Sequence, residues 1–196
     1  FSEHTDASYA IVECEKKIGF PMFIKPRRLG SSIGAYPVYN ADDFYKYFTR
    51  SMQAGSNRVI VEKLIENKRE LECAMFSTLD GVIISPPGEV ISKGFYSYES
   101  KYSSKTVTVA RAEISESVCK EVISYSRKLS SELSLRHLAR IDYFLSGDEV
   151  IFNEINTFPG FTRESLYPKL LTEMGIHPVD AIKAFVEDAI KDARPV

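Results

Sequence analysis

The chain has 196 residues, of which 44% are hydrophobic and 27% charged, and its formal net charge at pH 7 is −2. These proportions suit one globular domain, or two small lobes, with enough apolar material for a core. The near-neutral charge argues against the broad basic surface of a nucleic-acid-binding protein. No apolar run approaches the roughly 20 residues that span a bilayer. We therefore expect neither a nucleic acid nor a membrane as a partner.

The three cysteines, Cys14, Cys73 and Cys119, are odd in number and widely spaced, with no C-x-x-C motif. This pattern favours core thiols in a reducing cytoplasm over a disulfide framework or a metal site. The chain begins at Phe1 rather than at a methionine. We therefore expect it to be a piece of a longer protein.

The first part of the chain alternates between helical and extended patterns. Residues 7–19 predict a helix that ends at Gly19, because Pro21 prevents its continuation. The short strand MFIKP leads into the glycine- and serine-rich turn RRLGSSIG, and AYPVYN resumes extended structure. An amphipathic helix over 41–52 and the strand RVIVEKLI complete a first lobe, which we place at residues 1–66.

Residues 67–196 form the second predicted lobe, which opens with the strand RELECAMFST. Residues 88–110 have no helical period and predict a long surface loop, mobile over 88–106. A helix follows from Ser115, a suitable N-cap. The segments LARIDYFL and VIFNEIN predict a hairpin around SGDE. SLYPKLLTEMG and HPVDAIKAFVEDAIKDA predict two last helices, the second with Pro178 in its first turn.

Polar side chains gather on one face of this hairpin. Side chains alternate along a strand, so six of them are expected on that face: Arg140, Asp142 and Phe144 from the first strand, and Phe152, Glu154 and Asn156 from the second. Pairing Asp142 with Glu154 requires a loop of odd length, GDE or SGDEV, because two or four residues would put the acids on opposite faces. The same register sets Arg140 opposite Asn156.

Two carboxylates and an amide on one face favour a divalent cation. Like charges at cross-strand distance repel each other, and burial increases the cost. Oxygen ligands suit Mg²⁺, which keeps several waters and binds phosphate oxygens beside one or two carboxylates. Arg140 would supply a second hold on an anion. The alternative is a solvated hairpin face with an ordinary surface ion pair.

Lys25 precedes the RRLGSSIG turn and lies in an otherwise apolar strand. Backbone N–H groups in such a turn can surround phosphate oxygens, and a buried lysine is costly without an anion. The turn is not a Walker loop, since Gly34 is followed by Ala35 and Tyr36 rather than by a GK[ST] sequence leading into a helix. A plain hairpin turn is the alternative.

Six stretches, taken together and in order, resemble the D-alanine–D-alanine ligases of the ATP-grasp superfamily: FIKPRRLGSSIG, VIVEKLI, RELECAM, YSYESKY, LARIDYFL and FNEINTFPGFT. They span nearly the whole chain. The resemblance implies an α+β ATP-grasp fold whose two lobes, built of antiparallel sheets and flanking helices, hold ATP. It also implies Mg²⁺ or Mn²⁺ as cofactor, D-alanine as substrate, a role in peptidoglycan precursor synthesis, and a homodimer for the full-length protein.

The resemblance also assigns roles to individual residues. Asp142, Glu154 and Asn156 are the implied ligands of two magnesium ions. The implied ATP contacts are Lys25, Ser31, Ser32, Glu62, Lys63, Leu64, Ile65, Glu70, Lys101, Phe152 and Asn153. The implied catalytic residues are Lys101, Tyr102, Ser31, Arg140 and the Gly160 backbone N–H, and the implied substrate contacts are Gly160, Ser165 and Leu166.

In this family the carboxylate of one D-alanine attacks the γ-phosphate to give an acyl phosphate, and the amine of a second D-alanine displaces phosphate. Tyr102 and Leu166 are similar to the dipeptide-forming ligases rather than to the D-serine and D-lactate relatives. Arg163 and Glu164 depart from the family, whose members often carry small or apolar residues there. The family's N-terminal domain, which binds the first D-alanine, has no counterpart in this sequence, so we expect the chain to bind Mg-ATP but to ligate poorly.

Two alternative functions remain. One is another ATP-grasp carboxylate–amine ligase, including a D-Ala–D-Ser or D-Ala–D-Lac ligase. The other is a nucleotide-binding module without catalysis.

Overall fold

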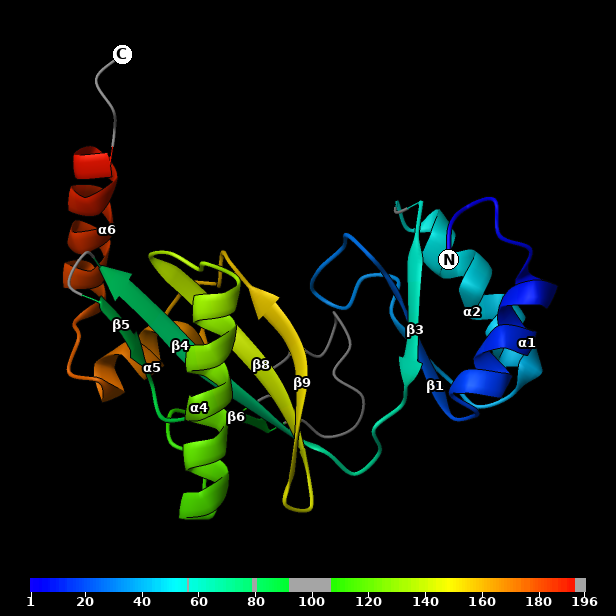
Figure 1. Cartoon of the computed structure of the whole chain (residues 1–196), viewed down its shortest axis with the longest axis horizontal. Coiled ribbons are helices and arrows are strands. Elements are labelled where there is room, and N and C mark those ends of the chain that lie inside the picture. Colours follow the sequence, from blue (N-terminus) through cyan, green and yellow to red (C-terminus); the bar gives the residue numbers. More distant parts are fainter. Residues whose placement is uncertain (56, 79–80, 92–106, 193–196) are drawn as a thin grey trace. The chain divides into compact units, whose positions relative to one another are not determined.

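A computed structural model describes residues 1–55, 57–78, 81–91 and 107–192. These residues divide into two compact units, Phe1–Glu66 and a second unit made of Asn67–Ile91 and the chain from Val107 onward. The first unit runs from blue to cyan in Figure 1, and the second continues through green and yellow to red. Each unit has its own β-sheet.

The first unit is an antiparallel sheet of three strands with two helices packed on it. The strand order is β2 (Tyr36–Val38), β1 (Met22–Pro26), β3 (Val59–Lys63). The helices are α1 (Ala7–Lys17) and α2 (Ala41–Gln53). Each begins at a side-chain cap: the Asp6 carboxylate accepts the N–H of Ser8 at 2.6 Å, and Asn40 Oδ1 accepts that of Asp43 at 2.9 Å. The helices and strands expected in this lobe are thereby confirmed.

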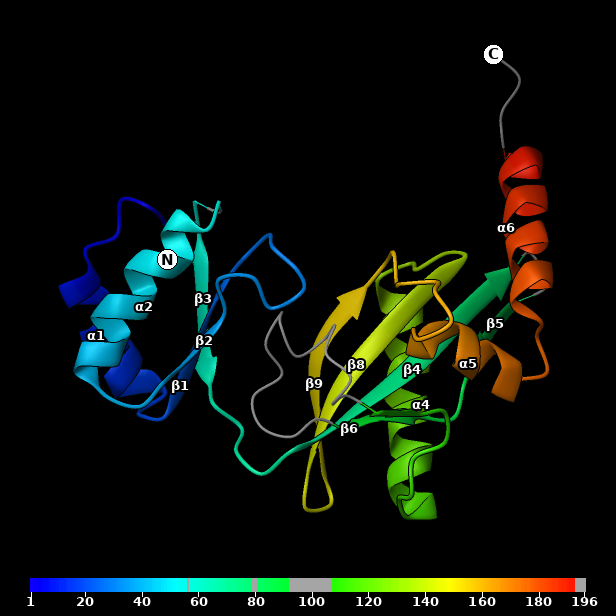
Figure 2. The same ribbon diagram turned by 180° about the vertical axis from the view of Figure 1, so that it is seen from behind.

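The second unit is built on a larger antiparallel sheet. Its strands, in the order β7-β6-β4-β8-β9 with β5 paired to β4, are β7 (Val107–Val109), β6 (Gly88–Ile91), β4 (Arg69–Thr78), β8 (Leu138–Ser146), β9 (Glu149–Asn156) and β5 (Gly81–Ile84). The helices are α4 (Glu116–Glu132), α5 (Leu166–Glu173) and α6 (Pro178–Asp192). Figures 1 and 2 show α4 on one face of the sheet and α5 on the other. The expected α+β architecture is confirmed.

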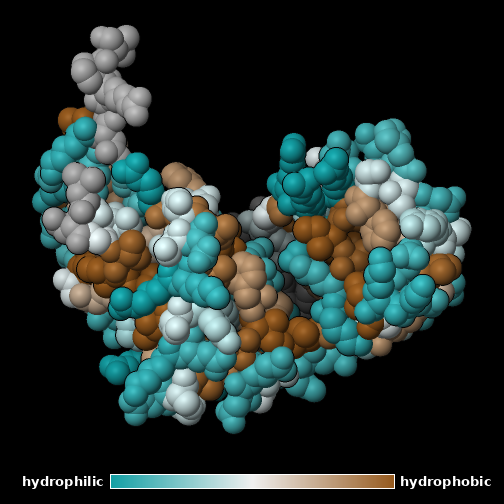
Figure 3. All heavy atoms as spheres, in the orientation of Figure 1, coloured by the Kyte–Doolittle hydropathy of each residue, from teal (hydrophilic) through white to brown (hydrophobic). Residues whose placement is uncertain are grey.

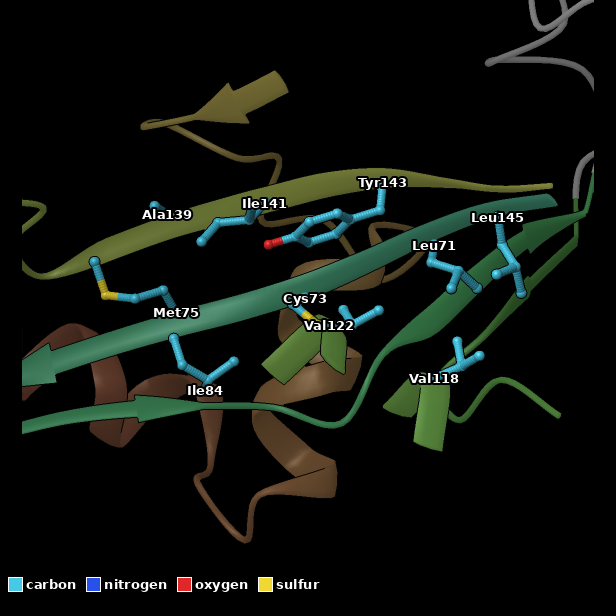
Figure 4. Packing of buried hydrophobic residues seen from close by; sticks show 10 residues of the cluster. All are labelled: Leu71, Cys73, Met75, Ile84, Val118, Val122, Ala139, Ile141, Tyr143 and Leu145. Carbon is cyan, nitrogen blue, oxygen red and sulfur yellow. The ribbon is translucent and has the colours of Figure 1, made fainter. Parts of the chain in front are cut away.

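The face of the sheet that α4 covers carries the core of the second unit. Figure 4 shows its members, which alternate along β4 and β8 and meet α4: Leu71, Cys73, Met75, Ile84, Val118, Val122, Ala139, Ile141, Tyr143 and Leu145. The Tyr143 hydroxyl lies 2.8 Å from Ser126 Oγ, so the polar end of this fully buried ring is satisfied. Because the odd-numbered side chains fill this core, the even-numbered ones of both strands face the opposite side.

On that opposite side, α5 and α6 cover only one end of β4. The Tyr167 hydroxyl of α5 donates to the Met75 carbonyl at 2.8 Å, and the rings of Phe76 and Phe185 of α6 lie 5.3 Å apart. The other end of β4 carries Glu70 and Glu72 on this face. The helices therefore bury the apolar half of the face next to a charged half.

The expected loop over residues 88–110 is wrong at both ends. Residues 88–91 form β6, which pairs with β4, and residues 107–109 form β7, which pairs with β6. The expectation of a mobile loop is thus wrong for 88–91, and residues 92–106 lie outside the described part of the chain. Strand β5 was not predicted.

No helix in the described ranges is long and apolar enough to cross a membrane. Exposed apolar side chains occur in both units, among them Tyr9 and Val12 of α1 and Val179 and Ile190 of α6. Figure 3 shows hydrophobic residues mixed with hydrophilic ones on the visible face of each unit. Such mixing is ordinary for the surface of a folded domain.

Candidate functional site

Three carboxylates lie in one row across neighbouring strands of the second unit. The pairing of β4 with β8 sets Glu72 opposite Asp142, and that of β8 with β9 sets Asp142 opposite Glu154. In the next row Arg140 lies opposite Asn156. Both cross-strand pairs predicted for the hairpin, Asp142 with Glu154 and Arg140 with Asn156, are confirmed.

The turn that was expected to produce this register is wrong. Strand β8 ends at Ser146 and β9 begins at Glu149, so the loop has two residues, Gly147 and Asp148, rather than an odd number. Tyr143 pairs with Phe152 and Asp142 with Glu154, which leaves Asn153 as an extra residue on β9. A β-bulge of this kind shifts the register by one. The bulge therefore restores the alignment of the acids that the even loop alone would prevent.

The bulge also moves Phe152 away from the predicted face. Phe152 lies opposite Tyr143, and the two rings are 6.2 Å apart in an edge-on arrangement. Tyr143 points toward Ser126 of α4, so Phe152 belongs to the α4 face. The expectation that Phe152 shares a face with Glu154 is wrong, because alternation counts residues and a bulge adds one to the count.

Arg140 is held against the acidic row from the neighbouring row. Its Nε and Nη2 donate to the two carboxylate oxygens of Asp142, each at 2.8 Å, and its Nε lies 3.2 Å from Glu72 Oε2. Burial lowers the pKa of Arg140, but the hydrogen bonds to Asp142 and the charges of Asp142, Glu72 and Glu154 outweigh burial and raise the pKa above that of free arginine. Arg140 is therefore a fixed positive charge next to a row of acids.

The acidic face continues along β4 to Glu70. The ammonium of Lys68 lies 3.8 Å from the Glu70 carboxylate and 3.5 Å from the centre of the Phe144 ring. Phe144 is opposite Glu70 in the register of β4 and β8. An aromatic ring, a lysine and a carboxylate thus lie together at the start of β4, where the first unit ends.

The segment after β9 folds back on itself. Asn156 Oδ1 accepts the N–H of Phe158 at 3.0 Å, and Ser165 Oγ accepts the N–H of Thr162 at 3.2 Å. A Cβ added at Gly160 would lie only 2.8 Å from Ser165 Oγ. The absence of a side chain at Gly160 thus lets its backbone approach the N-cap of α5.

The sequence-predicted substrate residue Leu166 lies inside the fold. It is 3% exposed, and its Cδ1 lies 3.2 Å from a Cβ built at Gly88 on β6. Ser165, directly before it, is half-buried and caps no N–H of α5. A substrate could therefore meet Ser165, whereas Leu166 is buried as a whole residue.

In the first unit, Lys25 has an anion within the chain itself. Its Nζ lies 2.8 Å from Glu62 Oε2 on the neighbouring strand β3. The anion that we expected Lys25 to need is thus supplied by β3, at least in part, and the proposed contact of Lys25 with phosphate stays a prediction. The structure brings together two of the residues predicted to contact ATP, Lys25 and Glu62.

The turn after β1 has an unusual backbone. Ser31, Ser32 and Gly34 have φ values of 56°, 59° and 71°, in the left-handed region. A Cβ at Gly34 would lie 2.7 Å from Ala54 Cβ and 2.9 Å from Pro26 Cγ, and the Gly34 carbonyl accepts the Ser51 hydroxyl at 2.6 Å. The turn is thus fixed to the end of α2.

The remaining predicted residues are spread more widely. Lys63 Nζ donates to the Phe20 carbonyl at 3.3 Å, and the Leu64 N–H donates to the Pro21 carbonyl at 3.1 Å. Ile65 follows as a half-buried residue. Lys101 and Tyr102 lie outside the described residues.

The donor set of the second unit fits a divalent cation. In the described part of the chain, no three His, Cys, Asp or Glu side chains converge as a preformed metal site. The opposed pair Asp142 and Glu154, with the amide of Asn156, nevertheless offers oxygen ligands of the kind Mg²⁺ prefers. The single guanidinium of Arg140 leaves the row of three carboxylates with excess negative charge, which a cation would balance.

Sequence reasoning missed Glu72. The segment RELEC places Glu70 and Glu72 two residues apart on a strand, and this is the same signal that drew attention to Glu154 and Asn156. Acids at this spacing share one face of a strand. The strand partner that makes Glu72 important, Asp142, is far away in sequence and became visible only in the sheet register.

Two solved structures to which this chain is similar are named as a synthetase and a ligase. D-alanyl-alanine synthetase A from Vibrio cholerae matches with a TM-score of 0.80 and 32% identity, covering 93% of this chain and 57% of that one. The VanG D-Ala:D-Ser ligase of Enterococcus faecalis matches with a TM-score of 0.82 and 29% identity, covering 95% and 54%. The fold is therefore of the ATP-grasp class, as predicted.

The family model described as D-ala D-ala ligase C-terminus matches residues 2–187. A D-alanine–D-alanine ligase of Oceanobacillus iheyensis is 39% identical over 181 residues, which are 90% of this chain and 49% of the relative. One of Shewanella woodyi is 42% identical over 159 residues, 79% and 47%. The chain belongs to the D-alanine–D-alanine ligase family, in its C-terminal part, and spans about half the length of these relatives.

Proposed function

We propose that this protein takes part in the ATP-dependent joining of two D-alanines for peptidoglycan precursors, in the cytoplasm. The carboxylate of one D-alanine would attack the γ-phosphate of ATP, and the amine of the second would displace phosphate from the acyl phosphate. A homodimer of the longer ligase is part of the proposal. The proposal rests on the family match over residues 2–187 and on the activity after which the relatives are named.

The observation that carries the proposal is the opposition of Asp142 and Glu154, with Arg140 held beside them. Phosphoryl transfer needs little covalent chemistry from a protein and depends on positioning and charge neutralisation. A row of acids with one fixed guanidinium beside it suits that task. We assign Asp142, Glu154 and Asn156 to the cation, which when bound would neutralise the charge of the triphosphate.

The protein's own residues then have distinct tasks. Arg140 would hold the oxyanion of the tetrahedral species together with the Gly160 N–H, and removing such a donor typically costs about 3–4 kcal/mol of transition-state stabilisation. Ser165, which directly precedes the buried Leu166, would meet the second amino acid. Neither step requires a protein nucleophile.

We propose nucleotide contacts within each unit, taken separately. Lys25 would contact the α- and β-phosphates, and the turn with Ser31 and Ser32 would lie over the β- and γ-phosphates. The adenine and ribose contacts that we propose are Glu62, Lys63, Leu64, Ile65, Glu70 and Asn153. Phe152, which the resemblance also implied, lies on the α4 face and is left out of this assignment. Lys101 and Tyr102 would complete the site.

The test is a chimera in which the first half of the Oceanobacillus iheyensis ligase is joined to this chain. We expect release of ADP that depends on D-alanine, formation of D-alanyl-D-alanine, and loss of both in the Glu154→Gln chimera. A folded chimera that binds Mg-ATP but releases no ADP with any acceptor would favour a nucleotide-binding module instead.

A D-Ala–D-Ser ligase is the second candidate, favoured by the likeness to the VanG D-Ala:D-Ser ligase. Arg163 and Glu164 are both exposed and directly precede Ser165. They could therefore affect which second amino acid is accepted. Turnover of the chimera with D-alanine, D-serine and D-lactate as competing acceptors distinguishes these products. We expect the D-alanine dipeptide to predominate.

A further inference from the structure

Arg140 has two carboxylate partners on two different strands. Asp142, on its own strand β8, takes both hydrogen bonds at 2.8 Å, and Glu72 of β4 lies 3.2 Å from the same Nε. All three side chains are largely buried: those of Arg140 and Glu72 are 16% and 11% exposed, and residue Asp142 is 8% exposed. A buried guanidinium without a carboxylate is strongly unfavourable.

The two roles of Asp142 compete. In the proposed function its carboxylate binds a divalent cation, yet here both of its oxygens are hydrogen-bonded to Arg140. Turning the carboxylate toward a cation weakens those bonds. A second acid must then hold the guanidinium in place and keep its charge balanced.

We propose that Glu72 is a positioning residue that holds Arg140 when Asp142 turns to the divalent cation. This inference rests on the proposed function and adds to it a role for Glu72, which has none in that proposal. Glu72 is already opposite Asp142 in the sheet and in contact with Arg140.

The test compares Glu72→Gln with a matched control in the same sheet. Glu89 of β6 accepts two hydrogen bonds from Arg69, at 2.6 and 2.7 Å, and does not contact Arg140. Glu89→Gln therefore removes the same charge and breaks an ion pair of the same kind. Both variants keep an oxygen at the altered position.

The readout is the Nε–H signal of Arg140 in the NMR spectrum of arginine-labelled protein, with and without Mg²⁺ and the non-hydrolysable analogue AMP-PNP. In the wild type we expect the signal to stay protected from solvent exchange in both states. In Glu72→Gln we expect protection without ligand and exchange faster by about tenfold or more with it, as the loss of a charged hydrogen-bond partner implies. Glu89→Gln should behave as the wild type does.

Equal protection in Glu72→Gln and the wild type at saturating Mg²⁺ and AMP-PNP would overturn the inference. Loss of protection of the Arg140 Nε–H in the wild type when Mg²⁺ and AMP-PNP are added would also overturn it. An acid that merely balances charge in the fold would lower the stability of Glu72→Gln without any dependence on ligand. If no signal of the wild-type protein responds to Mg²⁺ and AMP-PNP, the proposed function fails first, and this inference fails with it.

Discussion

Lys25 and Glu62 form an ion pair across strands β1 and β3, with 2.8 Å between Nζ and Oε2. The Lys25 side chain is 19% exposed and that of Glu62 40%. A pair open to solvent to this degree contributes little to stability, about 0.2–1 kcal/mol. Lys25 precedes the turn in which Ser31 and Ser32 have left-handed backbones. In the proposed function, it would leave the Glu62 carboxylate to contact a phosphate.

Replacing Lys25 with methionine should therefore weaken nucleotide binding while leaving the stability of the fold nearly unchanged. We expect Lys25→Met to change the free energy of unfolding by less than about 1 kcal/mol, while the affinity for Mg²⁺ and AMP-PNP falls about tenfold or more because a charged contact to phosphate is lost. Urea unfolding and calorimetry measure the two quantities. Lys46→Met on α2 removes the same charge from the same unit and should leave binding unchanged; an equal loss in both variants would refute the assignment.

Gly34 should tolerate no side chain. Its φ is 71°, and an added Cβ would meet Ala54 Cβ at 2.7 Å and Pro26 Cγ at 2.9 Å. We expect Gly34→Ala to destabilise the protein by roughly 1–3 kcal/mol through backbone strain and overpacking. Gly30→Ala is the control in the same turn, since a Cβ there would meet nothing within 4 Å. Thermal unfolding that ranks the two variants equally would contradict this account of the turn.

Stability should fall at alkaline pH because of Cys73. Burial raises the pKa of its thiol from an ordinary value of 9.0 to about 12, although a hydrogen bond from Ser126 acts in the opposite direction. The folded state thus keeps the thiol neutral while the unfolded state ionises from pH 9. This contribution is fully present below pH 9 and is lost as pH rises toward 12, at about 1.4 kcal/mol per pH unit at most.

Urea unfolding between pH 8 and pH 10.5 measures this loss. Cys73→Ala should lose less stability over the same range than the wild type, whatever its stability at pH 8. An identical pH dependence in the two proteins would show that the thiol does not contribute. The raised pKa of Cys14, also caused by burial, would account for part of the remaining dependence.

The sequence was informative where the signal is local. Alternation and charge placed Asp142 with Arg140 on one face of a strand and identified Glu154 and Asn156 on the next. The predicted pairing of Asp142 with Glu154 was correct, but the odd-length loop that was expected to produce it was wrong. A two-residue loop and a β-bulge produce it instead. The residues around Asn153 do not indicate a bulge. The assumption that alternate residues of β9 share one face therefore gave the wrong face for Phe152.

Other features depend on partners that are distant in sequence. Strands β6 and β7 have only four and three residues, too few for an alternating pattern to be recognised, and their pairing with β4 and with each other defines them as strands. The anion for Lys25 lies on another strand. Glu72 gains its importance from Asp142. Such long-range pairings could be inferred only from the three-dimensional structure.

The most direct test of the central claim is calorimetric titration of the 196-residue chain with AMP-PNP and Mg²⁺, for the wild type and for Glu154→Gln. Glu154 is exposed on the edge strand β9, so the change should spare the fold, whereas Asp142→Asn would disturb the buried Arg140. We predict saturable binding that requires Mg²⁺ and weakens about tenfold or more in the variant. Binding of equal strength in both proteins, or binding that persists in EDTA, would contradict the claim that these opposed carboxylates hold the cation of a bound nucleotide.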